Sequence, residues 1–293
     1  MRYRESLGSK LFDLFNSILI CALIVVMAYP FVYIFLLSVS HPTAISLGEV
    51  VFWPVRPHLK AYAMIFEVNN IANSYRNTII YTIVGTGLTL FFAVTMAFPL
   101  SRRDLKGRRG LMLILAVTLF MQSGMIPKFL LIKEMHLLDT IWAVTLPSAF
   151  SMWYVVLCRT NFQGIPDALI ESAGIDGAGM WRILFQIVLP LSKPILVTVA
   201  LFSSVEYWND FMNALLYIND TKWYPLQMVL RRLLTVADNI NEISLGDFED
   251  AGTGTIRMIQ AAATVVTVGP IILIYPFVQK YFIKGAMIGS LKE

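Results

Sequence analysis

Charged residues and cysteines are scarce in this sequence. Only 14% of its 293 residues are charged, whereas a soluble domain carries about a quarter because its surface must be solvated. The two cysteines, Cys21 and Cys158, lie in apolar segments, which excludes a disulfide framework and a cysteine-based zinc site. The phosphate-binding pattern G-x-x-x-x-G-K-S/T is missing too, because the nearest glycine-rich stretch, residues 252–255, has no lysine. The chain therefore cannot bind ATP through such a loop.

Long apolar runs are abundant instead, and hydrophobic residues make up 57% of the chain. A helix that crosses the hydrocarbon core of a bilayer needs about 20 mostly apolar residues. Runs of about this length predict six transmembrane helices, and hence an all-α, polytopic fold with one membrane domain over residues 1–293. The first run is too long for a cleavable signal core, so we expect a retained span. The runs cover about residues 14–40, 77–101, 110–127, 140–158, 194–218 and 258–279.

Lysine and arginine are unevenly distributed between the segments that connect these spans. With six spans, both termini lie on the same side as the second and fourth connections, and these segments hold most of the 23 basic residues. The densest cluster is the short second connection, residues 101–109. Because basic residues accumulate on the cytoplasmic side, we expect both termini to be cytoplasmic. The three histidines show no ligand spacing, so neither a metal site nor a catalytic set is expected.

The fourth connection, residues 159–193, is unusually long and is patterned. Pro166 and Asp167 are typical of the first turn of a helix. Gly174 and Gly177 then predict a turn, and a second helix follows. Such an elbow outside the membrane has too much apolar surface to remain in water without a partner, although it could equally pack on the protein's own helix ends. Its apolar residues are Leu169, Ile170, Ala173 and Ile175.

A motif in this elbow is recognisable. Glu171-Ser172-Ala173-x-x-Asp176-Gly177 and the later Leu189-Pro190 resemble the "EAA" loop of ABC importer permeases. The sequence departs from the motif at Ser172, where alanine is usual, but serine is small enough to preserve a docking face. Other stretches resemble carbohydrate-uptake permeases of the maltose type, and most closely importers of oligosaccharides derived from polysaccharides such as alginate. These stretches are Asn77-Thr78 and residues 97–102, 208–211, 225–227 and 275–282.

The resemblance implies a type I ABC importer permease fold in a bacterial cytoplasmic (inner) membrane. The loop at residues 162–193, chiefly 166–190, would dock as a coupling helix on an ABC ATPase dimer. That dimer would bind ATP and Mg²⁺, so this chain is expected to be no enzyme and to hold no cofactor. Further expected partners are a second homologous permease, an extracytoplasmic solute-binding protein, an oligosaccharide and membrane lipid, but no nucleic acid. The expected coupling residues are Leu169, Ile170, Glu171, Ser172, Ala173, Ile175, Asp176 and Gly177.

Glu206 and Asp210 are the only acids within an expected span. Because they are four residues apart, we expect them on one helical face near mid-membrane, lining a solute path or paired with a base of a neighbouring subunit. Nearby aromatic and amide side chains suit sugars, which have apolar ring faces and a rim of hydroxyls. The expected path residues are Glu206, Tyr207, Trp208, Asn209, Asp210 and Asn213.

Two other functions are compatible with this pair of acids. One is an ion-coupled secondary transporter with Glu206 and Asp210 as its ion site, but such carriers usually contain internal repeats, and none is visible here. The other is a membrane-embedded enzyme with paired carboxylates. Neither of these functions explains the cytoplasmic elbow, so the importer is the preferred hypothesis.

Overall fold

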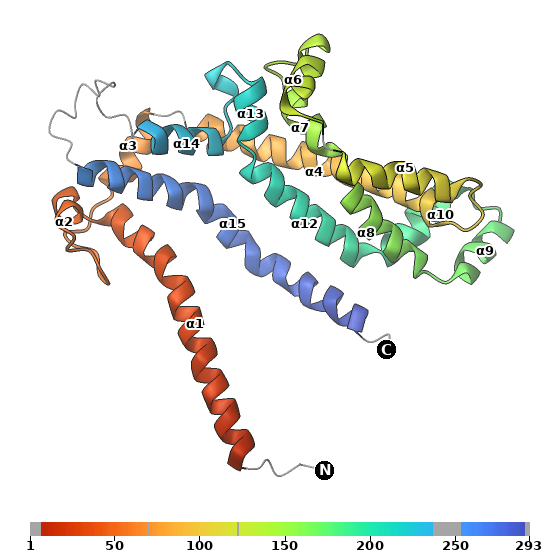
Figure 1. Ribbon diagram of the computed structural model, residues 1–293, viewed down its shortest axis with the longest axis horizontal. Helices are drawn as coiled ribbons and strands as arrows, with labels where there is room; N and C mark the ends of the chain where they lie inside the picture. Colours follow the sequence, from red (N-terminus) through yellow and green to blue (C-terminus); the bar gives the residue numbers. More distant parts are fainter. Residues whose placement is uncertain (1–6, 69–70, 122, 237–252, 291–293) are drawn as a thin grey trace. The chain divides into compact units, whose positions relative to one another are not determined.

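The computed structural model describes residues 7–68, 71–121, 123–236 and 253–290. Regular structure in these ranges is helical throughout, which confirms the predicted all-α class. Figure 1 shows the helices coloured along the chain. The α-helices are α1 (Leu7–Val39), α2 (Pro42–Ser46), α3 (Lys60–Val68), α4 (Ile71–Ser101), α5 (Arg108–Phe120), α6 (Met125–Glu134), α7 (Ile141–Ala149), α8 (Met152–Gln163), α9 (Asp167–Ile175), α10 (Met180–Ile183), α11 (Leu189–Leu191), α12 (Lys193–Asn209), α13 (Met212–Tyr217), α14 (Leu226–Val236) and α15 (Thr253–Ser290). A π-helix, η1 (Leu184–Val188), and a 3₁₀ turn, η2 (Thr221–Trp223), complete the described elements.

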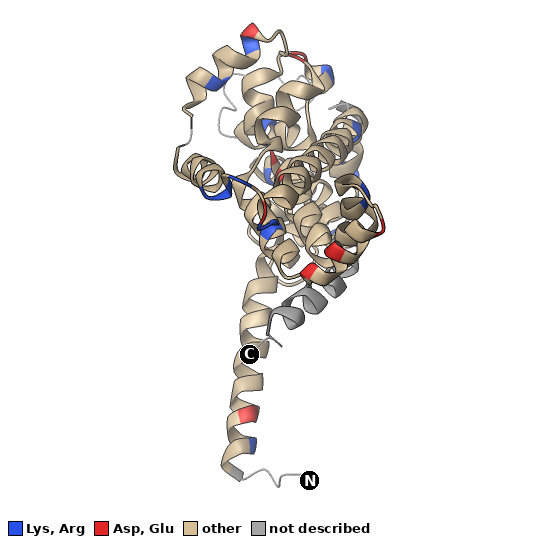
Figure 2. Cartoon of the chain, turned by 90° about the vertical axis from the view of Figure 1, so that its right-hand side faces the viewer, with Lys and Arg blue, Asp and Glu red and all other residues tan. Residues whose placement is uncertain are grey.

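Three single helices are long and apolar enough to cross a membrane: Gly8–Val39, Ile71–Ser101 and Thr253–Leu273. Three further pairs of shorter helices meet the same criterion only when each pair is taken together. These pairs are α5 with α6, α7 with α8, and Met180–Leu191 with α12, and they bend by 110°, 52° and 82°. By length and composition, the described chain therefore has up to six spans. Figure 2 shows acidic and basic residues mainly at helix ends and in connections.

The bent pairs show where apolar runs differ from continuous helices. In the run expected over 140–158, Phe150 and Ser151 are extended, and Pro147 precedes them. The run expected over 194–218 is interrupted after Asn209, because Asp210 adopts an extended conformation. A proline lacks the backbone N–H that an α-helix needs, and short irregular segments interrupt the hydrogen-bond ladder, so hydrophobicity alone does not locate these breaks.

The chain divides into two compact units, and the first is formed by Met1–Asn69 with Leu230–Gly269. In this unit α1 exposes its apolar side chains along most of its length; Val26, for example, is 70% exposed. At its end, the hydroxyls of Ser38 and Tyr62 lie 2.7 Å apart and connect α1 to α3. Gly254 of α15 packs directly against the backbone of α2, where an added Cβ atom would overlap the Pro42 carbonyl oxygen. This contact requires a glycine.

The second unit is formed by Asn70–Val229 with Pro270–Glu293. Its centre is α4, which packs against α7, α8 and α12 (Figure 1). Four residues of α4, α8 and α12 are fully buried in its core: Ala97, Val155, Cys158 and Val199. Small side chains allow helices to approach closely, which matters in a membrane because lipid is as apolar as the core itself.

A close approach in this unit joins α4 to α12 at Gly85. A Cβ atom at Gly85 would lie 2.5 Å from the ring of Tyr207. The Tyr207 hydroxyl donates a hydrogen bond of 3.0 Å to the carbonyl of Thr145 in α7, and it lies 3.4 Å from the hydroxyl of Thr89. Tyr207 therefore joins α4, α7 and α12, and it does so near the middle of α4.

Asp139 connects two turns of the second unit. Its backbone has a φ of 58°, and its carboxylate accepts hydrogen bonds from the backbone N–H groups of Asn219 and Asp220 and from the Asn219 side-chain amide. Its own N–H donates to the carbonyl of Tyr217 over 3.0 Å. Partial burial raises the pKa of Asp139, but these hydrogen bonds outweigh burial and lower the pKa below its ordinary value.

We expect this lowered pKa to make stability depend on acidity. A carboxyl group with a lowered folded-state pKa stabilises the protein above its unfolded-state pKa of about 4, and this contribution is lost as the pH falls through the folded-state value. Asp139→Asn should lower the free energy of unfolding at pH 7 by about 1 kcal/mol or less, because the group is largely solvated. Thermal unfolding of the parent and the variant in detergent, from pH 6 downwards, measures the difference in stability. An equal loss of stability of the two proteins on acidification would contradict the prediction.

Candidate functional site

The elbow predicted from the sequence consists of α9, a glycine turn and α10. Helix α9 begins directly after Pro166, whose backbone is non-helical. The turn is closed by two hydrogen bonds, from the N–H of Gly177 to the carbonyl of Gly174 and from the N–H of Ala178 to the carbonyl of Ala173. Gly177 has a φ of 77°, a conformation that disfavours side chains with a Cβ atom. The sequence therefore needs glycine at this position.

The apolar residues of the elbow have two different environments. Ile170 is buried, and Ala173 packs against the same core cluster. Ile175 at the end of α9 is 87% exposed, and Leu169 is 45% exposed. One face of the elbow therefore packs on the protein itself and the other faces outward, and docking of a partner on the outward face stays a prediction. Glu171, Ser172, Asp176 and Gly177 are also exposed.

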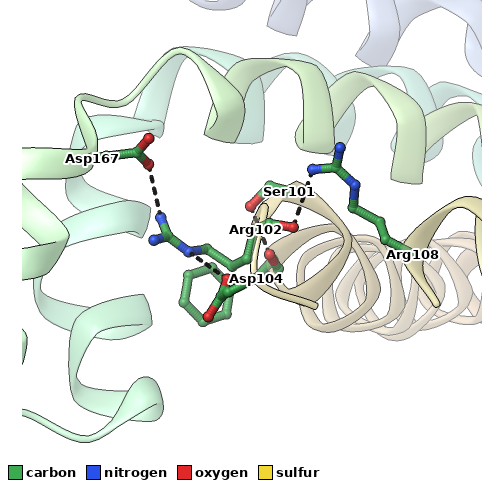
Figure 3. Close-up of polar contacts among 6 residues, drawn as sticks. Ser101, Arg102, Asp104, Arg108 and Asp167 are labelled. Carbon is green, nitrogen blue, oxygen red and sulfur yellow. Dashed lines mark hydrogen bonds and ion pairs between the residues drawn. The ribbon is translucent and has the colours of Figure 1, made fainter. Parts of the chain in front are cut away.

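Arg102, directly after α4, connects the core of the unit to the elbow (Figure 3). Its Nη1 donates to a carboxylate oxygen of Asp167 in the first turn of α9 over 3.4 Å, and its Nε lies 3.8 Å from Asp104. Arg108 donates to the Arg102 carbonyl, and Arg159 of α8 donates to the Leu100 carbonyl over 3.0 Å. Sequence reasoning did not identify this connection, although Arg102 ends the family-like stretch 97–102.

The predicted geometry of Glu206 and Asp210 is wrong. They do not share a helical face, because α12 ends at Asn209 and Asp210 is extended. The Asp210 carboxylate accepts hydrogen bonds from the backbone N–H and the side-chain amide of Asn213 over 3.1 and 2.6 Å. The same amide donates to Ser148 over 3.1 Å. Asp210 and Asn213 thus stabilise the first turn of α13, because a carboxylate there satisfies N–H groups that lack helical partners.

Glu206 and Asn209 are exposed, whereas Tyr207 and Trp208 are 4% and 8% exposed. The Gln227 side-chain amide donates a hydrogen bond to the Asn209 amide oxygen over 3.0 Å. The exposed Glu206 and Asn209 and the half-buried Gln227 thus form a polar group, which we call the α12 polar patch. Gln227 was not selected as a site residue, although it belongs to a family-like stretch.

Helix α4 holds Gln227 in place through the segment before it. The Asn77 amide donates to the carbonyl of Lys222 over 2.7 Å, and the Tyr81 hydroxyl donates to that of Trp223 over 2.8 Å. The Thr78 hydroxyl accepts from the N–H of Leu226 over 2.8 Å. The two family-like stretches Asn77-Thr78 and 225–227 are therefore hydrogen-bonded to each other. Because they are far apart in the chain, the sequence alone does not reveal this contact.

The described residues contain no group of three or more His, Cys, Asp or Glu side chains that could hold a metal ion. What they do offer is an outward-facing apolar helix end at α9 and a polar patch at α12. The first is suited to docking a protein, and the second to contacting a hydroxyl-rich solute.

Comparison with known proteins identifies the family of this chain. Residues 2–287 match the family described as "Binding-protein-dependent transport system inner membrane component". The polygalacturonan/rhamnogalacturonan transport system permease protein YtcP of Bacillus subtilis (strain 168) is 38% identical over 97% of this chain and 99% of its own length. Protein LplC of the same organism is 38% identical over 97% of this chain and 96% of its own length.

A solved structure supports the same assignment. The crystal structure of a bacterial ABC transporter involved in the import of the acidic polysaccharide alginate contains a chain that superimposes with a TM-score of 0.86 at 31% identity. The match covers 95% of this chain and 99% of that one. A type I permease fold with several membrane-crossing helices is therefore established for the sequence. This chain belongs to the family of binding-protein-dependent transport system inner membrane components, the multi-pass permease subunits of ABC importers.

Proposed function

We propose that this chain forms half of the translocation path for an oligosaccharide in an ATP-driven importer. The observation that carries the proposal is the elbow. Its Ile175 is exposed on an outward face, whereas its Ile170 is buried in the core around α4, so the elbow connects the two. Membership of the family favours this function over an ion-coupled carrier that uses Glu206 and Asp210. The capping role of Asp210 is a further argument against such an ion site.

Coupling in this proposal runs through the elbow. ATP and Mg²⁺ bind to a partner ATPase dimer, whose closure moves Glu171–Gly177 with it. The ion pair between Arg102 and Asp167 and the packing of Ile170 then transmit this movement to α4 and α8. A second homologous permease completes the path, and an extracytoplasmic binding protein delivers the solute. Both termini of this chain lie in the cytoplasm.

We place the solute against the α12 polar patch. Tyr207, Trp208, Asp210 and Asn213 were also expected on the path, and in the proposal they position α12 and α13 beside it. Tyr207 does this by contacting Gly85, and Trp208 by packing edge-on against Tyr75 with ring centroids 6.4 Å apart. The exposed carboxylate of Glu206 and amide of Asn209, with the half-buried amide of Gln227 beside them, can hydrogen-bond sugar hydroxyls.

Glu206→Gln is expected to reduce transport at least about tenfold, because a charged acceptor forms stronger hydrogen bonds to hydroxyls than a neutral amide. The amount of chain in the membrane and its association with the ATPase should not change. Uptake of labelled oligosaccharide into proteoliposomes measures the effect. Glu134→Gln, an exposed glutamate at the end of α6, is the matched control and should transport normally. Equal transport by both variants would remove Glu206 from the path.

The substrate is proposed to be an oligosaccharide derived from a polysaccharide, with alginate fragments as the first choice. The support comes from the relatives, which concern polygalacturonan, rhamnogalacturonan and alginate. The test is ATP hydrolysis by the complete importer with its binding protein, stimulated by a panel of uronate and neutral oligosaccharides. Stimulation by uronate oligomers is expected. Stimulation by amino acids or ions alone would contradict the proposed substrate class.

A further inference from the structure

A cavity of about 510 Å³ lies at the end of α4, within the second unit. Its size is in the range of sites that bind small molecules. One wall is the last turns of α4 and the segment after it, and the other is α10 with the start of η1. The lining residues are Thr95, Phe98, Pro99, Arg102, Asp104, Leu105, Lys106, Met180, Trp181 and Leu184. The cavity is therefore largely apolar, with charged groups along one side.

The elements around this cavity all lie at the ends of candidate membrane spans. Helix α4 ends at Ser101, and α5 begins at Arg108. The opposite wall begins at Met180, where another candidate spanning pair starts. The cavity thus lies at the ends of candidate spans. Trp181 and Phe185 stack there with centroids 6.1 Å apart while remaining 63% and 60% exposed, as expected for aromatic residues at a membrane interface.

The charged side of the cavity is suited to an anion. Two basic residues, Arg102 and Lys106, line it with a single acid, Asp104. The Nε of Arg102 is buried and has no hydrogen-bond acceptor among the residues that the structure describes, since Asp104 is 3.8 Å away. A buried donor of this kind costs free energy until it finds an acceptor. The guanidinium of Arg102 and the exposed ammonium of Lys106 line the cavity and would face a phosphate bound there.

We propose that this cavity binds an anionic phospholipid of the surrounding bilayer, with its phosphate against Arg102 and Lys106 and its acyl chains along Trp181 and Phe185. The cytoplasmic location of the cavity rests on the proposed function. Basic pockets between membrane helices on that side are suited to anionic headgroups. Because Arg102 also contacts Asp167 of α9, the lipid would touch the residue that holds the elbow.

The test measures lipid retention by the detergent-purified full chain with native mass spectrometry. Phosphatidylglycerol should be retained and phosphatidylcholine lost. The double variant Arg102→Gln/Lys106→Gln should retain phosphatidylglycerol about tenfold less, because two cationic contacts are removed. The matched control, Arg103→Gln/Arg109→Gln, removes two exposed charges of the same segment that do not line the cavity, and it should retain lipid like the parent. Equal retention by both double variants would overturn the proposal.

Two further measurements keep the proposal falsifiable if the first variant misfolds. Lys106→Gln alone leaves the Arg102–Asp167 contact intact and should still weaken retention. Brominated phosphatidylglycerol should quench the fluorescence of Trp181, read as the difference between the parent and Trp181→Phe. Loss of this quenching when the ATPase is bound would assign the cavity to the ATPase interface instead. Complete displacement of the brominated lipid by glycerol phosphate would show that the cavity binds an anion and not a lipid. None of these readouts depends on transport, so they fail independently of the proposed function.

Discussion

Ile175→Asp is expected to abolish co-purification of the ATPase subunits with this chain. Ile175 is 87% exposed at the end of α9, next to a glycine turn that presents it outward. Burying an aspartate in an apolar docking cleft leaves a charge without a partner, and such central interface residues contribute about 2 kcal/mol or more. Affinity purification of the tagged chain, followed by quantification of bound ATPase, measures the loss.

Leu47→Asp is the matched control for this variant. Leu47 is a similarly exposed aliphatic residue, at 73%, and follows α2 in the other unit. This control should retain the ATPase at the parental level. If Ile175→Asp also retained it, and the complete importer still hydrolysed ATP in response to solute, the elbow would not be the docking site. A Gly177→Val variant tests the turn separately, because valine strongly disfavours the φ of 77°.

Gly85→Val is expected to destabilise the second unit more than any other single glycine substitution in α4. A Cβ atom at this position would lie 2.5 Å from the Tyr207 ring, so α4 and α12 must separate or the ring must move. Moving the ring also breaks its hydrogen bond to Thr145. Overpacking of this kind costs about 1–3 kcal/mol, and the lost hydrogen bond adds about 1 kcal/mol. Thermal unfolding in detergent measures the effect.

Gly87 provides an internal control two residues further along α4. A Cβ atom there meets nothing within 4 Å, so Gly87→Val should unfold like the parent. Tyr207→Ala should partly rescue Gly85→Val, because the added side chain then occupies the space of the removed ring. If the two substitutions were simply additive, the contact between Gly85 and Tyr207 would not determine how α4 packs against α12.

Much of this molecule could be predicted from the sequence, because each prediction rested on a local pattern. Apolar runs define spans by their length and hydrophobicity, and every residue of a run contributes to both. The elbow was predictable for the same reason: Pro166, Gly174 and Gly177 act on their own backbone conformations. Its family motif then identified the kind of protein, which the comparisons confirm.

Only the tertiary structure decided which side chains meet. Asp210 is four residues from Glu206, and helical spacing predicted a shared face. The chain instead leaves the helix at Asp210, whose carboxylate accepts hydrogen bonds from Asn213. Gln227 lies beside Asn209, and Arg102 beside Asp167, through contacts that no local pattern encodes. The sequence by itself determined that the chain crosses a membrane and carries the elbow at α9 and α10. The packing around α4 decided which of its polar residues face outward, because burial depends on neighbours that are distant in the chain.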